Sequence, residues 1–281
     1  MQSWQTSDPE QLLKIANKIR ISIVESLTEA GSGHLGGSLD LADIFSCLYF
    51  CILKNDPKNP GWSDRDRLVL SIGHVVPVLY ATLAHAGYFP IEELNTLRKL
   101  NSRLQGHPAR DRGLPGIELS AGSLGQGLSV GTGMALAGKS DHRTHRIFVI
   151  LGDGELQEGS VWEAAMSAAH YHLDNLIAIV DRNGLQIDGR TENVMKLEPL
   201  MDKWRSFGWL VFSIDGHNPE QLLETVKMIQ LEKNRPSVIL ANTCMGKGIL
   251  RIEGDPHWHG KVPNKEESIE FIEELKNKFN Q

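Results

Sequence analysis

Blocks of apolar residues alternate along the chain with blocks of mixed polarity, a pattern typical of strands and helices in turn. Residues 146–151 and 176–180 are apolar runs with the length of short buried strands. Residues 158–171, between the two runs, predict a helix. A strand, a helix and a strand of these lengths form one right-handed crossover that joins parallel neighbours in a sheet.

The first 31 residues predict a helix with defined ends. Ser7 and Glu10 have the spacing of a capping box, and Pro9 suits the first helical position. Gly31 is expected to end the helix. Apolar residues repeat between these ends at helical spacing, at Leu12, Ala16, Ile19, Ile23 and Leu27.

The rest of the chain continues the alternation. Strands are expected over residues 68–71, 210–214 and 237–241, and helices over 39–53, 77–87, 127–138, 200–207, 219–231 and 265–279. Residues 102–123, rich in Gly, Pro and Arg, predict a long irregular loop of the kind that usually carries function. The fold class is therefore α/β, with a mostly parallel sheet flanked by helices in one domain over residues 1–281.

Composition narrows the classes of function. The net charge of −6, without a stretch that concentrates Lys and Arg, argues against nucleic acid as a partner. No apolar run could span a membrane, and the start lacks a signal-peptide pattern. Cys47, Cys51 and Cys244 are odd in number, and the first two are one helical turn apart, as on a buried helix face. A cytoplasmic protein with reduced cysteines is expected.

Oxygen-bearing residues follow both strands of the crossover. Gly152-Asp153-Gly154 ends the first strand, and Asn183 and Leu185 follow the second. Parallel strands present their carboxyl ends at one edge of the sheet, where such folds bind ligands. A carboxylate, an amide oxygen and a backbone carbonyl suit Mg²⁺ or Ca²⁺ with positions left for phosphate oxygens. Gly-Asp-Gly alone is also a common turn, so this interpretation depends on the matching Asn.

Four of the eleven histidines adjoin a glycine in loop-like settings, namely His34, His74, His107 and His259. Each comes just after an expected helix or strand end. Neutral imidazoles both donate and accept hydrogen bonds, so a cluster of them suits proton transfer to and from hydroxyl and carbonyl oxygens. Any one of them could instead be an ordinary loop residue. Zinc is a rival interpretation, but the spacings follow no compact ligand motif. The remaining histidines with no such setting, including His217, are expected to be surface or packing residues.

A glycine-rich turn over residues 121–127 is expected to open a helix. Its spacing is not that of a dinucleotide-binding or Walker loop, so those cofactors are rejected. Such a turn can still offer backbone amides and a carbonyl to a flat heterocycle.

Together these motifs resemble the thiamine diphosphate-binding domain of transketolases over nearly the whole chain. The resemblance is carried, in chain order, by Ser32-Gly33-His34, Leu70-Ser71-Ile72-Gly73-His74, Gly106-His107-Pro108, Gly122-Ser123-Leu124-Gly125-Gln126-Gly127, Gly152-Asp153-Gly154-Glu155-Leu156-Gln157-Glu158-Gly159, Asp181-Arg182-Asn183, Met245-Gly246-Lys247-Gly248 and Trp258-His259-Gly260. It implies a three-layer thiamine diphosphate-binding fold.

The resemblance also implies roles for individual residues. Asp153, Asn183 and the Leu185 carbonyl would hold Mg²⁺, with Ca²⁺ or Mn²⁺ as possible substitutes, and the ion would hold the diphosphate. The other cofactor-binding residues would be Gly154 through its amide, His74, His259, Lys247, and Gly122 and Leu124 through their backbone. The catalytic residues would be His34, His74, His107, His259 and Glu158. Glu158, with Glu163 as a weaker member, would join an acid network that bridges subunits; a helix N-terminal charge is the other interpretation of Glu158.

The implied reaction is the transfer of a two-carbon ketol unit from a ketose phosphate to an aldose phosphate, as in the pentose phosphate pathway. Two departures from the family matter. Leu35-Gly36-Gly37 follows His34 where many members have Pro and bulkier residues, so the sugar pocket is expected to differ. No segment after His259 fits the family's pyrimidine-binding or C-terminal domain, so both are expected on a separate second chain, in an α2β2 assembly; a truncated transketolase is the other explanation.

Two further hypotheses stay open at this point. One keeps the cofactor but changes the reaction, as in a 2-oxo acid dehydrogenase alpha chain or a 1-deoxyxylulose-5-phosphate synthase-like enzyme. The loops at Gly33-His34 and His107 favour sugar chemistry over these. The other hypothesis is a relative that has lost catalysis, against which the intact Asp153, Asn183 and histidines argue.

Overall fold

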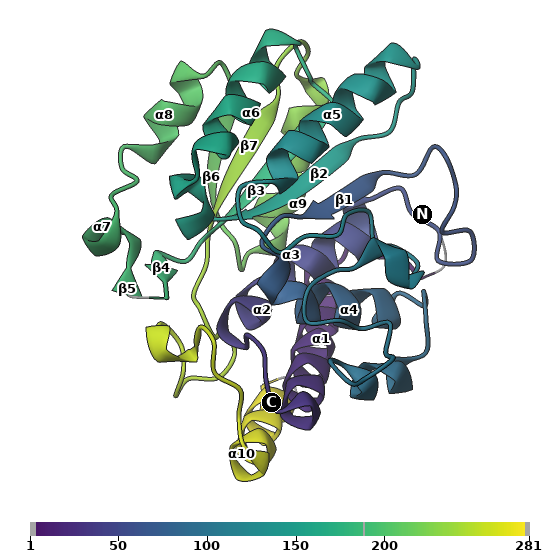
Figure 1. The fold of residues 1–281 in the computed structure, drawn as a ribbon, viewed down its shortest axis with the longest axis vertical. Helices are drawn as coiled ribbons and strands as arrows, with labels where there is room; N and C mark the ends of the chain where they lie inside the picture. The colour runs from purple at the N-terminus through teal and green to yellow at the C-terminus, as the bar shows by residue number, and fades with distance from the viewer. Residues whose placement is uncertain (1–3, 188, 279–281) are drawn as a thin grey trace.

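A five-stranded sheet forms the centre of the computed structural model, which describes residues 4–187 and 189–278 (Figure 1). The strand order is β1-β2-β3-β7-β6, and every neighbouring pair is parallel. These strands are β1 (Arg67–Leu70), β2 (Ile147–Gly152), β3 (Leu176–Arg182), β6 (Leu210–Asp215) and β7 (Ser237–Asn242). The α/β prediction, with a parallel sheet flanked by helices, is confirmed.

Helices cover both faces of the sheet (Figure 1). One face is packed by α5 (Gly127–Ser140), α6 (Gly159–His170) and α8 (Leu200–Ser206). The other face is packed by α1 (Pro9–Ala30), α3 (Ala42–Cys47), α4 (Val76–His85) and α9 (Pro219–Leu231), and α10 (Lys265–Asn277) packs against α1. The shorter helices are α2 (Gly36–Asp40) and α7 (Thr191–Val194).

Strand β2 shows why these strands are apolar throughout. Phe148 and Ile150 belong to the core on the side of α1, whereas Val149 and Leu151 belong to the core on the side of α5. All four side chains are fully buried. A strand that is covered on both faces needs apolar residues at every position, so its sequence lacks the alternation of a half-exposed strand.

The first helix begins at Pro9, as expected, but its capping residue differs from the one predicted. Asp8, rather than Ser7, is the N-cap, and its side chain accepts a hydrogen bond from the amide of Glu10 (3.0 Å). Gly31 ends the helix, as expected, in the left-handed conformation with φ of 64°. The prediction of a capping box at Ser7 and Glu10 was therefore wrong, because the carboxylate of Asp8 reaches the free helical amides first.

The continuous helix expected over residues 39–53 was also wrong. The segment is broken into α2, α3 and a turn of π-helix at Leu48–Ile52. Nearly every side chain of the segment is buried, Asp40 and Asp43 included. A stretch that is apolar all round has no helical period to mark its breaks, so the sequence could not place them.

At the edge of the sheet where the strands end, much of the chain is irregular. The loop over residues 102–123 contains a short 3₁₀ helix at Arg110–Arg112 and is otherwise irregular, in agreement with the prediction. A small antiparallel hairpin of β4 (Leu185–Gln186) and β5 (Gly189–Arg190) follows β3 and was not predicted. The helix expected over 265–279 is observed to Asn277, and residue 279 lies outside the described part. Within the described residues, no helix has the length and apolar character needed to cross a membrane.

Candidate functional site

A pocket of about 390 Å³ opens at the carboxyl ends of β1, β2 and β3. Segments far apart in the sequence meet there, from the loop after α1 to the segment that precedes α10. The structure brings into its lining every predicted site residue except Lys247 and Glu163, namely His34, His74, His107, Gly122, Leu124, Asp153, Gly154, Glu158, Asn183, Leu185 and His259.

Three of the four predicted histidines form a cluster within this pocket. The ring centroids of His34 and His74 are 4.9 Å apart, those of His74 and His259 are 5.2 Å apart, and those of His34 and His259 are 5.6 Å apart. Burial, together with the neighbouring imidazoles, lowers the pKa of His34 to about 4 and the pKa of His74 to about 3. Burial also lowers the pKa of His259. All three imidazoles are therefore neutral at neutral pH.

Two ring nitrogens of the cluster are left without a partner. Nδ1 of His34 and Nδ1 of His259 are buried and make no hydrogen bond to any residue that the structure describes. Buried polar atoms are normally paired, so orphaned nitrogens in a pocket indicate where a ligand binds.

His107 lies against the glycine-rich turn. A Cβ placed on Gly122 would lie 3.7 Å from Cδ2 of His107, so the ring is in contact with the turn. Burial and the charge of Arg98 lower the pKa of His107. His107 lines the same pocket and is more exposed than the clustered histidines.

Asp153 connects the ends of β2 and β3. Its carboxylate is 2% exposed and accepts hydrogen bonds from the amides of Gly154 and Gly184, both at 2.7 Å. It also pairs with Arg182, with Nη1 and Oδ2 3.0 Å apart. Asp153 and the turn at Asn183-Gly184 therefore lie side by side, as the parallel crossover predicted.

Asn183 is held in one orientation by its own hydrogen bonds. Its Nδ2 donates to Oδ2 of Asp40 (3.1 Å) and to Oδ2 of Asp181 (3.2 Å), while its Oδ1 accepts from the amide of Leu185 (2.9 Å). Because the backbone amide of Leu185 can only donate, it fixes which end of the Asn183 amide carries the oxygen.

The carboxyl groups beside Asn183, namely those of Asp40, Asp153 and Asp181, suit a divalent cation. Burial and the neighbouring carboxylates hold the pKa of Asp40 well above its ordinary range and raise the pKa of Asp181 to about 8. Oδ1 of Asp40 is buried without a partner among the described residues. A cation bound by Asp153, the Asn183 amide oxygen and the Leu185 carbonyl would offset the excess negative charge, and these hard oxygens fit Mg²⁺. In the described part of the chain, no three His, Cys, Asp or Glu side chains are placed to hold one metal ion, which leaves the zinc interpretation without support.

Two glycines at or next to the pocket leave little space for a side chain. A Cβ on Gly154 would lie 3.2 Å from Cβ of Gln186, and a Cβ on Gly73 would lie 2.9 Å from the carbonyl oxygen of Ala121. Bare backbone at Gly154 leaves room for a phosphate oxygen beside the amide, whose hydrogen is bonded to Oδ1 of Asp153 in this structure. Apolar side chains of Ile72 and Leu124 line the same pocket and suit a flat heterocycle.

Two predicted residues stand apart from the core of the site. Lys247 does not line the pocket, and its Nζ lies 3.6 Å from Oε1 of Glu253. Glu158 lines the pocket but is exposed at the start of α6, where its Cβ would lie 2.7 Å from a Cβ on Gly125. Glu163, one turn further along α6, is exposed as well.

Sequence reasoning missed a buried carboxylate that organises the site. Glu155 is 1% exposed and accepts hydrogen bonds from the hydroxyl of Ser71, from the amide of Gly125 (2.7 Å) and from the amide of Gly152 (3.2 Å). The Ser71 hydroxyl in turn accepts from the amide of Gly127 (3.0 Å). Glu155 thus joins three of the loops that line the pocket. The signal available was a carboxylate immediately after the Gly-Asp-Gly turn.

His217 has a more specific role than the sequence suggested. Nδ1 of His217 hydrogen-bonds to Oδ2 of Asp43 (2.8 Å), and Nε2 of His217 accepts from the amide of Cys244 (2.9 Å). Asp43 in turn pairs with Arg20. This buried chain of contacts ties the segment that carries Met245, a residue of the pocket, to α1 and α3. His217 is a packing residue, as expected, but one that positions part of the site.

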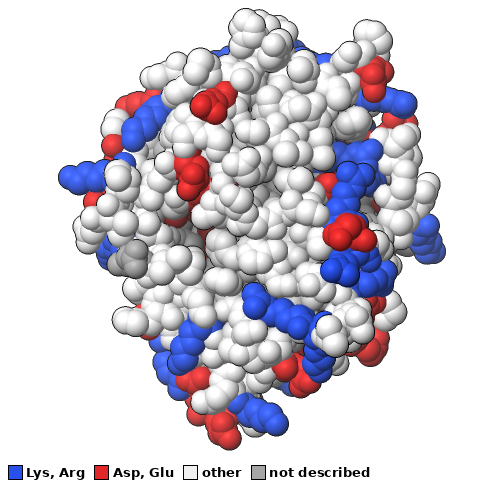
Figure 2. All heavy atoms as spheres, in the orientation of Figure 1, with Lys and Arg blue, Asp and Glu red and all other residues white. Residues whose placement is uncertain are grey.

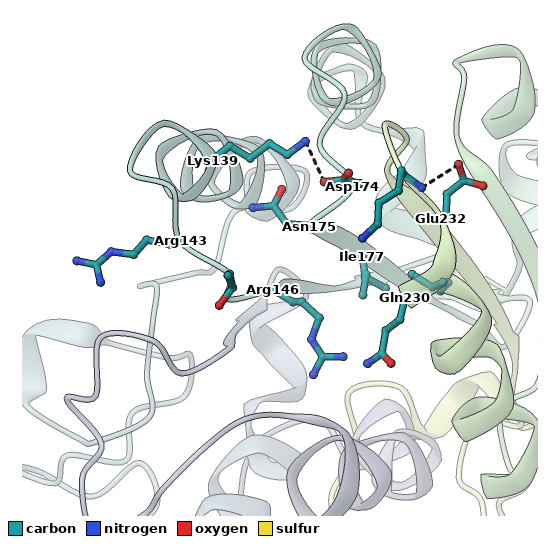
Figure 3. Close-up of a pocket in the computed structure, with 11 residues that line it drawn as sticks. Lys139, Arg143, Arg146, Asp174, Asn175, Ile177, Gln230 and Glu232 are labelled. Atoms are coloured by element: carbon teal, nitrogen blue, oxygen red, sulfur yellow. Dashed lines mark hydrogen bonds and ion pairs between the residues drawn. The ribbon is translucent and has the colours of Figure 1, made fainter.

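A second cavity, of about 310 Å³, lies at the opposite edge of the sheet (Figure 3). Two of the cations that line it already have partners. Nζ of Lys139 lies 2.8 Å from Asp174, and Arg146 is held by Asp66 (2.5 Å). None of the predicted site residues lines it, so this cavity is separate from the candidate site.

Comparisons with known proteins agree with the geometry. Residues 12–280 match the family model described as the thiamine diphosphate-binding domain of transketolase. The chain is 51% identical to the 6-deoxy-6-sulfo-D-fructose transketolase subunit SqwG of Clostridium sp. strain MSTE9, over 85% of this chain and 86% of that protein. It is 43% identical to an apulose-4-phosphate transketolase subunit of Phocaeicola vulgatus, over 92% of each.

The fold is also similar to that of solved transketolases. The transketolase from Leishmania mexicana superposes with a TM-score of 0.89 at 32% identity, over 96% of this chain and 41% of that one. The chain therefore spans less than half of this solved enzyme, but most of the length of relatives that are named as subunits.

Proposed function

Because this chain belongs to the transketolase family through its thiamine diphosphate-binding domain, we propose that it is the cofactor-binding subunit of a two-subunit transketolase. It transfers a two-carbon ketol unit between sugars together with its partner. One observation carries this proposal. The ends of β2 and β3, with their oxygen ligands, and a cluster of neutral histidines open on the same pocket. The relatives are named as transketolases, which favours this reaction over that of a 2-oxo acid dehydrogenase or a 1-deoxyxylulose-5-phosphate synthase.

Asp153, Asn183 and the Leu185 carbonyl would hold Mg²⁺, and the ion together with the amide of Gly154 would hold the diphosphate of the cofactor. The backbone of Gly122 and Leu124 would contact its pyrimidine ring. Support comes from the buried carboxylate of Asp153, from the fixed amide of Asn183 and from the bare backbone at Gly154. Lys247 contributes at most indirectly, because it lies outside the pocket lining.

The histidines would handle the protons of the sugar. Bound thiamine diphosphate supplies the carbon that attacks the ketose carbonyl and the electron sink needed when the C2–C3 bond breaks. His34, His74 and His259 are neutral, so they can accept a hydroxyl proton from the donor and return a proton to the product. The free Nδ1 atoms of His34 and His259 are available to sugar hydroxyls. His107, the most exposed of the four, would bind the sugar as well.

The face over α5 and α6 supports contact with other subunits. Figure 2 shows that charged side chains are sparse across the centre of this face. Leu136 on α5 and Met166 on α6 are apolar and exposed there, at 39% and 59%. Apolar surface of this kind is typical of interfaces. We place here the contacts of an α2β2 assembly, in which the second subunit carries the pyrimidine-binding and C-terminal domains, with Glu158 near the boundary.

The donor would be a ketose with an acid group at its far end. The relatives are named for a sulfonated ketose and for a phosphorylated one, and the identity is higher to the first. Pentose phosphates remain candidates by family membership. The three cysteines are all free, as in a reducing compartment, so we place the enzyme in the cytoplasm.

The decisive experiment is reconstitution with the second subunit. We expect no turnover of xylulose 5-phosphate or 6-deoxy-6-sulfofructose by this chain alone, because half of the cofactor's binding surface is supplied by the partner. Adding the partner, thiamine diphosphate and Mg²⁺ should give ketol transfer to an aldose phosphate. Turnover by the single chain, or release of CO₂ from pyruvate by the assembled enzyme, would contradict the proposal. An absence of any heat of cofactor binding in the assembled enzyme would indicate a relative that has lost catalysis.

Replacing His107 by alanine should separate sugar binding from cofactor binding. His107 is exposed and is not among the residues proposed to hold the metal ion or the diphosphate, so calorimetry should give an unchanged affinity for thiamine diphosphate. The rate of ketol transfer by the assembled enzyme should fall about 10²-fold, the usual contribution of one proton-transferring group. A loss of cofactor with normal turnover of the loaded enzyme would mean that the roles are assigned wrongly.

A further inference from the structure

Arg98 lies between two of the loops that carry site histidines. Its Cζ would lie 2.8 Å from a Cβ on Gly106, the residue before His107, and its Nε would lie 3.8 Å from a Cβ on Gly33, the residue before His34. Its Nη1 donates to the hydroxyl of Ser32, 3.3 Å away. The guanidinium therefore contacts both loops and fills the space that glycine leaves beside it.

The backbone of Arg98 is held for this placement. Its φ is +59°, in the left-handed region that residues with a Cβ rarely adopt. Its amide donates to the carbonyl of Leu104 at 2.8 Å. Residues kept in a disfavoured conformation are commonly found at functional sites, where the surroundings fix them.

The charge of Arg98 is not balanced by a carboxylate. Among residues 4–187 and 189–278 it has no ion-pair partner, whereas the adjacent Lys99 pairs with Glu29 at 2.5 Å. Besides burial, the neighbouring His259, Arg98 and His107 all lower the pKa of His34, and the ring centroid of His74 lies 4.9 Å from that of His34. His107 faces Arg98 as its main charged neighbour.

We propose that Arg98 is a positioning residue of the transketolase site, which joins the Ser32–His34 loop to the Gly106–His107 loop and places a cation beside both imidazoles. It acts through the two histidines and need not touch the substrate. Its importance for turnover rests on the proposed function, but its effect on the two imidazoles does not.

The first test needs only the purified chain. NMR titration of the histidine rings, with His34 and His107 assigned from H34Q and H107Q, is compared between the wild type and the variants R98M, R98K and K99M. In R98M the positive charge is lost, so the midpoints of His34 and His107 should move to higher pH. R98K keeps the charge and should stay near the wild type. K99M, the matched control, removes a neighbouring cation that is already paired and should move neither histidine.

The second test uses the enzyme assembled with its partner. In R98M we expect kcat to fall about tenfold, the acid limb of the pH–kcat profile to move to higher pH, and the affinity for thiamine diphosphate to stay within about twofold of the wild type. R98K should keep the position of the acid limb but still lose kcat, because an ammonium lacks the planar contacts with both loops.

The outcomes separate this proposal from the proposed function. Unchanged midpoints of both histidines in R98M would overturn the role of Arg98. So would a rise only in KM for acidic sugars, which would make Arg98 a substrate-binding residue instead. If the assembled wild type shows no ketol transfer, the proposed function fails while the NMR titration still decides the role of Arg98.

Discussion

Replacing Asp153 by asparagine is expected to weaken the binding of Mg²⁺ and thiamine diphosphate about a hundredfold or more. The change keeps the shape of the side chain but removes the one charged ligand among the three proposed oxygen ligands. Loss of a group in the immediate surroundings of a metal ion typically costs ten- to a hundredfold in affinity, and loss of a direct ligand costs more. Calorimetric titration of the enzyme assembled with its partner measures this directly.

Asp153 also has structural partners, so the variant needs a control. Its carboxylate pairs with Arg182 and accepts two backbone amides, contacts that the asparagine keeps only in part. Asp174→Asn is the matched control, since Asp174 also pairs with a cation, Lys139, but lies at the opposite edge of the sheet (Figure 3). Equal cofactor affinity in D153N and D174N, with both variants folded, would remove Asp153 from the metal site.

Replacing Glu155 by alanine is expected to lower the free energy of unfolding by about 3 kcal/mol. The change leaves the buried amides of Gly125 and Gly152 without an acceptor, and each such orphan costs about 1–3 kcal/mol. The loops at Ser71 and Gly125 would then separate, and cofactor affinity should fall with stability. Urea unfolding of the isolated chain, followed by circular dichroism, measures the loss.

Two further variants show whether the buried contacts of Glu155 are the cause. E155Q keeps one acceptor oxygen and should lose less stability than E155A. The loss should be smaller still because burial already raises the pKa of Glu155, which makes its ionised form costly. E158A removes a carboxylate three residues along the chain that is exposed, and should leave stability almost unchanged. A stability loss in E155A no larger than that in E158A would show that Glu155 does not hold the loops together.

The predictions from sequence succeeded where the chain carries a local signal. Strands β2 and β3 were placed nearly to the residue, because each is an uninterrupted apolar run that ends at glycine or at polar residues. The helix ending at Gly31 was predicted for the same kind of reason, a period of apolar positions closed by glycine. Residues 39–53 failed because burial on all sides removes the period.

The residues of the candidate site were likewise predicted correctly only where a local rule applies. Asp153 and Asn183 could be paired in advance because a parallel crossover necessarily brings consecutive strand ends to one edge. Lys247 belongs to a motif of the right composition, but its side chain turns to Glu253 instead of the pocket. No local rule sets the direction of a long side chain in a loop, because that depends on which partner happens to lie within its reach.

From the order of its residues alone this chain reveals its class of fold, the edge of the sheet where chemistry occurs, and the residue types that carry it. These features follow from periodicity and from the geometry of parallel strands, which act over a few tens of residues. The pairing of Glu155 with Ser71, the fixed amide of Asn183 and the placement of Arg98 against two glycines became visible only in the folded molecule. Each joins segments that no local pattern connects, since packing and burial of the whole domain bring them together.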